Sequence, residues 1–318
     1  EWWYVTGNLG DAEGHRVGYQ LTIFRNALAP FAPQSSSAWA TQQAYMAHLA
    51  VTDAGGGEFH AFERFARGAL GLAGARARPF RVWLEDWVLE AEGSEGIFPM
   101  RVRASEGDVT LDLTLDAGKP PVLQGEAGLS RKGPEPGNAS YYYSHTRMPT
   151  TGTVVLRGDT LAVSGASWLD REWSTSVLTE GQVGWDWFAL QMDDGWELMV
   201  YALRMADGGA HPLSEGLLVD PQGRSRRLAF GTDVQVTPVD TWTSPHSGVR
   251  YPSAWRVRVP SRRWELDVAP VLEDQELNLA FRYWEGAVDV RGRVGGEGPS
   301  GSGYVELTGY GEGVLPER

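Results

Sequence analysis

Residues 2–25 read WWYVTGNLGDAEGHRVGYQLTIFR, and this stretch has the pattern of a β-hairpin. Two apolar runs, 2–9 and 15–25, flank the turn-forming segment GDAEG, as expected for two strands joined by a glycine-rich loop. More strand-like runs follow along the chain, separated by DG, GG, PG and GD turn signals. Helical periodicity is weak, and the best candidate for a helix or an apolar loop is 62–75. Many short strands with turns between them predict an all-β protein of antiparallel barrels or sandwiches.

The hairpin pattern occurs a second time. Residues 185–204, WDWFALQMDDGWELMVYALR, again have two aromatic residues, a short Asp/Gly turn and an apolar strand that ends in arginine. Later segments also repeat in the same order: 141–148 and 164–173 in the first half, 281–290 and 301–310 in the second. A repeated order of elements predicts two related β-barrel domains, residues 1–180 and 181–318, joined near residues 177–184.

Composition narrows the classes of function. The chain has 318 residues and a net charge of −13, so a nucleic-acid backbone is not an expected partner. It contains no cysteine, which excludes disulfides and thiolate metal sites. The six histidines are scattered without HxxxH or HExxH spacing, and no phosphate-loop or nucleophile-elbow context occurs. We therefore predict neither a metal ion nor an organic cofactor.

The two hairpins carry matching aromatic faces. Side chains alternate between the faces of a strand, so Trp2, Tyr4 and Asn8 share one face, and Trp185 and Trp187 share the equivalent face. Both faces grade from aromatic to hydrogen-bonding side chains, as the walls of a mostly apolar binding cavity do. Plain filling of a hydrophobic core is the alternative for each tryptophan.

Residues 165–173, GASWLDREW, place carboxyl groups between tryptophans. On a strand, Trp168, Asp170 and Glu172 share a face. Two carboxylates that share an enclosed site repel, and repulsion with desolvation raises the pKa of one of them, which leaves an acid able to donate a proton. The alternatives are that an arginine such as Arg171 neutralises the pair, or that Glu172 faces water.

Residues 140–148, SYYYSHTRM, add Tyr141, Tyr143 and His145 on one face. His145 beside tyrosines would orient water or hold a carboxylate, and a hydrogen-bonded core histidine is the alternative. Further ligand-binding candidates come from the repeated segments in the second half: Trp284, Tyr304 and Glu306.

Three segments in combination, EWWYVTGNL, SGASWLDREWS and YWEGAVDVRG with GSGYVELTGYG, resemble the AttH/CrtC family over nearly the whole chain. The resemblance implies two lipocalin-like barrels with an apolar pocket and a periplasmic or secreted location. For hydratases related to carotenoid 1,2-hydratase it implies cofactor-free addition of water to an isoprenoid double bond. The aromatic-x-Asp motif of the family falls on Trp168 and Asp170, and its histidine on His145. The LDREW stretch is closer to the branch known as predicted secreted hydrolases than to the carotenoid branch.

Two functions are open at this point. One is a cofactor-independent hydratase, or a related lyase or isomerase, with Asp170 as proton donor and Glu172, His145 and Tyr143 beside it. The other is a non-catalytic lipocalin-like carrier. Either would bind an apolar small molecule, and a peripheral contact with a membrane would give access to it. An enclosed Asp170 without a bridging arginine favours the enzyme.

Overall fold

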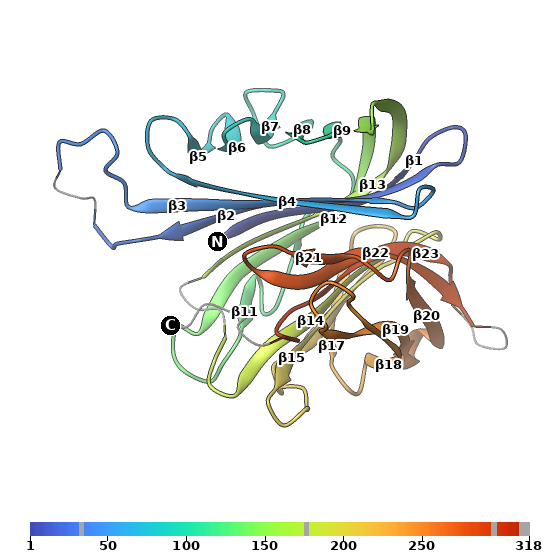
Figure 1. Ribbon diagram of the computed structural model, residues 1–318. Helices are drawn as coiled ribbons and strands as arrows, with labels where there is room; N and C mark the ends of the chain where they lie inside the picture. The colour runs from blue at the N-terminus through green and yellow to red at the C-terminus, as the bar shows by residue number, and fades with distance from the viewer. Residues whose placement is uncertain (32–34, 175–177, 294–297, 312–318) are drawn as a thin grey trace. The chain divides into compact units, whose positions relative to one another are not determined.

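The computed structural model describes residues 1–31, 35–174, 178–293 and 298–311 (Figure 1). Regular structure in these ranges consists of β-strands and one 3-10 turn, η1 (Pro260–Arg262). No helix in the described ranges is long and apolar enough to cross a membrane. The strands form two antiparallel sheets, which confirms the predicted all-β fold class.

The first sheet contains thirteen strands in the order β4-β3-β2-β1-β13-β12-β9-β8-β7-β6-β5, with β10 and β11 paired to β12. Their bounds are β1 (Trp2–Gly10), β2 (Arg16–Ala27), β3 (Gln43–Asp53), β4 (Glu58–Arg67), β5 (Ala73–Ala77), β6 (Phe80–Leu84), β7 (Trp87–Ala91), β8 (Met100–Glu106), β9 (Val109–Leu115), β10 (Val122–Leu123), β11 (Leu129–Arg131), β12 (Ala139–Leu156) and β13 (Asp159–Ser174).

The second sheet contains ten strands in the order β17-β16-β15-β14-β23-β22-β20-β19-β18, with β21 paired to β22. Their bounds are β14 (Gln182–Met192), β15 (Glu197–Met205), β16 (Glu215–Val219), β17 (Ser225–Ala229), β18 (Gln235–Thr243), β19 (Arg250–Val259), β20 (Trp264–Pro270), β21 (Glu276–Asn278), β22 (Arg282–Gly292) and β23 (Gly301–Leu307).

The two sheets have the same internal order. In the first sheet, β1 lies between β2 and β13, and β13 pairs in turn with β12. In the second sheet, β14 lies between β15 and β23, and β23 pairs in turn with β22. Both predicted hairpins form, with Trp2 opposite Phe24 and Trp187 opposite Tyr201. Strands β1, β2, β12 and β13 thus correspond to β14, β15, β22 and β23, as the sequence repeat predicts.

Two glycines extend this equivalence to the register. A Cβ atom on Gly165 of β13 would lie 2.2 Å from the carbonyl oxygen of Asn8, and a Cβ atom on Gly301 of β23 would lie 2.3 Å from that of Gln191. Asn8 and Gln191 occupy matching positions in the two hairpins. The last strand of each sheet therefore meets its first strand at an equivalent place, where a side chain does not fit.

Clustering of contacts divides the chain into two compact units. Unit 1 comprises 1–55, 60–118 and 147–171, and unit 2 comprises 56–59, 119–146 and 172–318. The predicted boundary at residue 180 separates the two sheets but not these units, because 119–146 and the end of β13 belong with unit 2. The division into domains 1–180 and 181–318 stays a prediction, and residue 177 of the predicted linker lies outside the described residues.

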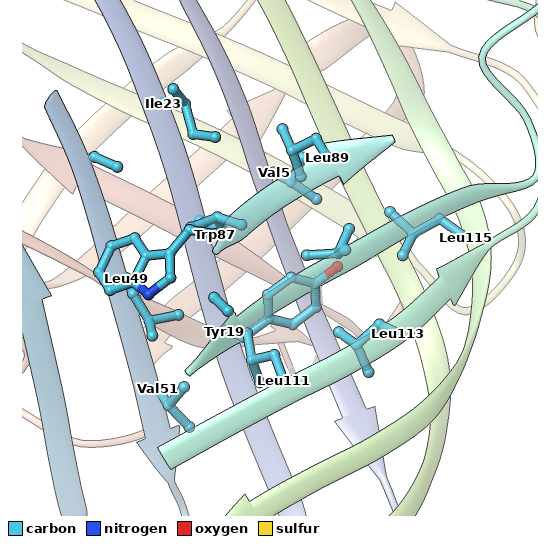
Figure 2. Packing of buried hydrophobic residues seen from close by; sticks show 14 of the residues in the cluster. Val5, Tyr19, Ile23, Leu49, Val51, Trp87, Leu89, Leu111, Leu113 and Leu115 are labelled. Atoms are coloured by element: carbon cyan, nitrogen blue, oxygen red, sulfur yellow. The ribbon is translucent and has the colours of Figure 1, made fainter. Parts of the chain in front are cut away.

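The core of unit 1 forms because its sheet curls until distant strands face each other. Strand β6 contacts β2 and β3, and one apolar cluster unites residues from β1 to β3 with residues from β7 to β9. Figure 2 shows Tyr19 and Leu49 meeting Trp87 and Leu111 in this cluster, and all four are at most 1% exposed. Strand β9, VTLDLTL, alternates buried and half-buried residues as its sequence predicts.

Unit 2 has its own apolar core. Phe188 of β14 packs edge-to-face on Trp255 of β19, with ring centroids 5.4 Å apart, and Trp255 also lies against Trp284 of β22. The cluster draws residues from β14 to β16 and from β19 to β23, so this sheet also curls around one core.

The helical alternative for 62–75 is wrong. Strand β4 continues to Arg67, a turn follows, and β5 begins at Ala73. Arg64 stabilises the strand ending because its guanidinium stacks 4.6 Å from the Trp87 ring and pairs with Glu106 at 2.7 Å. These tertiary contacts outweigh the weak helical pattern.

Strands β1 to β3 are buried on both faces, which distinguishes them from half-buried strands such as β9. Their odd-numbered side chains, among them Val5, Tyr19 and Leu49, belong to the apolar core. The even-numbered side chains on the other face include buried polar groups: Thr6, Gln20, Thr22, His48 and Thr52. Burying polar groups is costly unless they have hydrogen-bonding partners, so a cluster of them on one face indicates a functional site.

We predict that Gly165→Ala and Gly301→Ala each lower the free energy of unfolding by about 1–3 kcal/mol, the usual cost of overpacking. Gly93→Ala is the matched control, because a Cβ atom there meets nothing within 4 Å. Guanidinium denaturation of the three variants would measure the effect. Equal stability of all three would contradict the equivalent register of the two sheets.

Candidate functional site

A row of buried side chains crosses the outer face of the first sheet, opposite its apolar core. Tyr4 of β1 pairs with Thr22 of β2, and Thr22 pairs with His48 of β3. These three side chains are at most 6% exposed. Because direct partners in antiparallel strands project to the same face, phenol, hydroxyl and imidazole stand side by side.

Asp170 of β13 extends this row. Gly7 lies against Ser167, and Gly165 lies against Leu9, which fixes the antiparallel register of β1 and β13. Three residues further along each strand, Tyr4 stands opposite Asp170. The equivalent pair in unit 2, Trp187 and Glu306, is in direct register, which supports this assignment. The row therefore runs from Asp170 through Tyr4 and Thr22 to His48.

The carboxyl group of Asp170 is 3% exposed and accepts a hydrogen bond of 2.6 Å from the indole Nε1 of Trp168. The neighbouring Arg171 points to the opposite face, where its guanidinium lies 4.1 Å from the Trp3 ring and pairs with Glu1. Asp170 is thus enclosed and hydrogen-bonded to an indole, and its catalytic role stays a prediction.

His48 is uncharged at neutral pH. Its ring is fully buried and makes an edge contact with Phe24, with centroids 5.6 Å apart. Burial lowers the pKa of His48 to about 4, because desolvation penalises the imidazolium. A neutral imidazole can both donate and accept a hydrogen bond, so it can orient a water molecule or a substrate hydroxyl. Next to the row, Gln20 donates a 2.6 Å hydrogen bond to Thr22.

The equivalent face of unit 2 carries a different row. Glu306 of β23 stands opposite both Trp187 of β14 and Glu285 of β22, and Trp187 stands opposite Tyr201 of β15. Glu285 is 1% exposed, and Glu306 accepts a hydrogen bond of 3.2 Å from the indole of Trp185. The indole-to-carboxylate bond of unit 1 thus has a counterpart, whereas the position of His48 is taken by Glu215, the partner of Tyr201.

Glu172 has a counter-ion of its own. Its carboxylate lies 3.1 Å from the Nζ of Lys132 and accepts a short hydrogen bond from Ser140. The ammonium also lies over the rings of Tyr142 and Tyr201, at 5.6 and 4.7 Å. The predicted neutralising partner therefore exists as a lysine rather than an arginine. Glu172 clusters with unit 2, and Asp170 with unit 1.

Tyr141, Tyr143 and His145 of β12 share a face, as their alternation predicts: both tyrosine rings contact Trp173, and Tyr143 contacts His145. Tyr141 is 57% exposed and stacks on Trp173, with centroids 5.5 Å apart, while Tyr142 on the other face is buried and accepts a hydrogen bond from Trp187. Tyr143 is half-buried and makes an edge contact of 5.9 Å with His145. The pKa of His145 is lowered to about 4, because burial outweighs the hydrogen bond that its ring donates to the backbone carbonyl of Lys119.

The other predicted ligand-binding residues divide between the faces. Trp284 is part of the apolar core of unit 2, and its indole donates to the carbonyl of Glu273 at 2.8 Å. Tyr304 is buried on the opposite face, where it stands across from Ala189 and Ala287. Trp2 and Asn8 are half-buried on the face of Tyr4. The catalytic and ligand-binding roles of all these residues stay predictions.

One group of potential metal ligands lies among the described residues. Asp11, Glu13 and His15 bring their ligating atoms within 4.8 Å of one another in the turn between β1 and β2. His15 already pairs with Asp11 at 2.7 Å, which raises the pKa of His15. This turn joins β1 and β2, the strands that carry Tyr4 and Thr22 of the row.

A family model described as AttH-like matches residues 1–310. The chain belongs to the AttH-like family. The crystal structure of a putative AttH protein from Nitrosomonas europaea has a TM-score of 0.82 and 36% sequence identity, covering 97% of this chain and 92% of that chain. The family assignment made from the three sequence segments is thereby confirmed.

Two curated relatives have names that state an activity. Kievitone hydratase of Fusarium solani subsp. phaseoli is 24% identical over 259 residues, which cover 75% of this chain and 68% of the relative. Dehydratase asqC of Emericella nidulans is 27% identical over 246 residues, which cover 70% of this chain and 67% of the relative. The relatives support a family of hydratases and dehydratases.

Sequence reasoning missed His48, Thr22 and Gln20. The signal was present, because Gln20, Thr22 and His48 are polar residues at even-numbered positions of mostly apolar strands. This signal does not identify a site, because a single polar residue in an apolar strand does not show which other strands will lie beside it.

We predict that His48 makes the stability of the protein depend on pH between about 4 and 6.5. The folded-state pKa is below the unfolded value, so the contribution is present above pH 6.5 and is lost as the pH falls toward 4. The full difference is worth about 3 kcal/mol. Guanidinium unfolding at several pH values should show a shallower dependence for His48→Gln than for the parent protein. Identical dependences would show that His48 titrates normally.

The Lys132–Glu172 pair generates a second prediction. Glu172→Gln should lower the free energy of unfolding by about 3–5 kcal/mol, because it leaves the Lys132 ammonium without its carboxylate in a buried position. The double change Glu172→Gln with Lys132→Met should recover part of this loss. If Glu172→Gln instead preserves stability, the ion pair does not hold this region together.

Proposed function

We propose that the protein is a cofactor-independent hydratase or dehydratase and that Asp170 transfers the proton. The observation that carries the proposal is the buried row in which Asp170 lies beside Tyr4 and ends at the neutral imidazole of His48. The two curated relatives, a hydratase and a dehydratase, catalyse opposite directions of one type of reaction, as their names state. Both directions need one group that alternately donates and accepts a proton.

The reaction can be written with these residues. In hydration, the Asp170 carboxyl gives its proton to one carbon of a C=C bond, whose π electrons form the new C–H bond and leave a cation on the other carbon. Water adds its oxygen to the cation, and the surplus proton returns to the Asp170 carboxylate. Aromatic faces such as Tyr4 and Trp168 stabilise the cation. Dehydration is the reverse sequence.

The substrate class follows from the surroundings of the acid. Trp2, Tyr4 and Trp168 present aromatic surface on the same face as Asp170, whereas cationic groups of unit 1 such as Arg171 lie on the other face. A site lined in this way suits an apolar alkene that carries few hydrogen-bonding groups, such as an isoprenoid or polyene. A carotenoid is one member of this substrate class.

The test is incorporation of solvent hydrogen into product. The protein would be incubated in D2O with a panel of apolar alkenes and tertiary alcohols that includes kievitone, and mass spectrometry would detect added water, lost water or carbon-bound deuterium. We expect Asp170→Asn to abolish turnover, a loss of at least about 100-fold for removal of a general acid. The melting temperature should change little, since Asn keeps the acceptor for the Trp168 indole.

The matched control is Asp108→Asn, which changes an exposed carboxylate in the turn between β8 and β9. It should leave both turnover and stability unchanged. Ligand binding without turnover in the parent protein would favour the lipocalin-like carrier instead. A large loss of stability in Asp170→Asn, with turnover per folded molecule intact, would show that Asp170 is structural.

A further inference from the structure

Gln20 of β2 lies beside the row that runs from Asp170 to His48. Its direct partners are Thr6 of β1 and Ala50 of β3. These three positions lie two residues along each strand from the members of the row, so their side chains project to the same face. Gln20 is 1% exposed, and both partners are buried with it. The candidate site therefore contains a carboxamide as well as an imidazole and a hydroxyl.

The amide of Gln20 is bonded at one end only. Its Nε2 donates a 2.6 Å hydrogen bond to the Thr22 hydroxyl, whereas its Oε1 accepts none from the described residues. A buried amide is usually bonded at both ends, as Gln275 is: it donates to the carbonyls of Leu272 and Ala287 and accepts from the N–H of Ala287. A buried carbonyl oxygen without a donor costs stability. Gln20 therefore keeps an unused acceptor at the candidate site.

The repeat shows that the fold does not need this amide. Gln20 is equivalent to Met199 of β15, because Met199 pairs with Ala189 as Gln20 pairs with Thr6. Met199 is 1% exposed, so an apolar side chain of similar length fills this place in the second sheet. The amide of unit 1 is thus explained by binding rather than by packing.

We propose that the Oε1 of Gln20 accepts a hydrogen bond from a hydroxyl group of the bound substrate. The inference rests on the proposed function in calling the bound molecule a substrate. Strand β1 separates β2 from β13, so Gln20 lies roughly 10 Å from Asp170 across the sheet, at about 4.8 Å per strand. The hydroxyl bound there is therefore distinct from the one that addition of water creates beside Asp170.

The chemistry of the acceptor selects the class of donor. A buried neutral amide gives an ammonium group no charge to replace its lost solvation, so the donor is neutral. A hydroxyl is the neutral donor that an otherwise apolar alkene can carry. An analogue whose hydroxyl is methylated leaves the oxygen unmatched, which is how buried polar groups discriminate between ligands. The substrate class narrows to an apolar alkene with a hydroxyl remote from the reacting double bond.

The experiment compares the alcohols geraniol, farnesol and geranylgeraniol, each with its methyl ether, which keeps the oxygen but has no donor. Calorimetric titration into the Asp170→Asn variant would measure affinity without conversion. For at least one pair we expect the alcohol to bind roughly tenfold more tightly than the ether, the ratio for one neutral hydrogen bond. When Gln20→Met is added to this background, the ratio should fall to about one, because the acceptor is gone.

Gln222→Met is the matched control, because Gln222 is exposed in the turn between β16 and β17. It should keep the ratio of its background. A thermal melt adds a second measurement: Gln20→Met should melt near the parent temperature, whereas Gln275→Met, which loses an amide bonded at both ends, should melt clearly lower. Equal affinities or no binding across all the pairs, a ratio that persists in Gln20→Met, or equal destabilisation of Gln20→Met and Gln275→Met would overturn the proposal.

The role of Gln20 and the proposed hydratase fail separately. A preference for the alcohol that depends on Gln20, while the alkene and alcohol panel shows no turnover, would overturn the hydratase and leave Gln20 as a ligand-binding residue. Turnover of these alcohols with no preference over their ethers would overturn the role of Gln20 alone.

Discussion

The pairing of the first strand of each sheet with its last strand is the constraint on which the candidate site depends. β1 is the first strand of this sheet along the chain and β13 is the last, so their pairing closes a long loop of chain. Gly7 and Gly165 permit the close approach of the two strands. The register of that contact places Asp170 opposite Tyr4. A shift by one residue would move Asp170 into the apolar core and Leu169 out of it, because side chains alternate with a period of two. The register is thus fixed by hydrophobic burial.

A second consequence of the pairing is that both faces of β1 to β3 are used. One face supplies the apolar core, and the other carries a buried polar row that the core does not need. The same strands thus stabilise the fold with one face and carry the proposed site on the other. The neutral state of His48 follows from the same burial, which costs the imidazolium its solvation.

The repeat allows the two units to be compared as variants of one design. In unit 1 the row contains Asp170, Tyr4, Thr22 and His48, and at the equivalent places unit 2 has Glu306, Trp187, Tyr201 and Glu215. Both keep an indole that donates to the carboxylate of the last strand. Unit 2 lacks a histidine at this position and opposes two glutamates instead. The row of unit 1 is therefore the one that contains a neutral imidazole, and the proposed chemistry is placed there.

The sequence by itself determined the all-β class, the two hairpins, the repeated order of strands and the shared face of Trp168 and Asp170. These features depend on local alternation, turn residues and spacing along one strand, which are properties of neighbouring residues. Only the tertiary structure decided that His48 and Thr22 join Asp170, that Lys132 is the counter-ion of Glu172, and that Tyr142 rather than Tyr141 is buried. Each of these depends on strands that are far apart in the chain, and residues 62–75 became strand and turn for the same reason. Pairing partners, and which face a pair buries, are set by the closure of the whole sheet around its core.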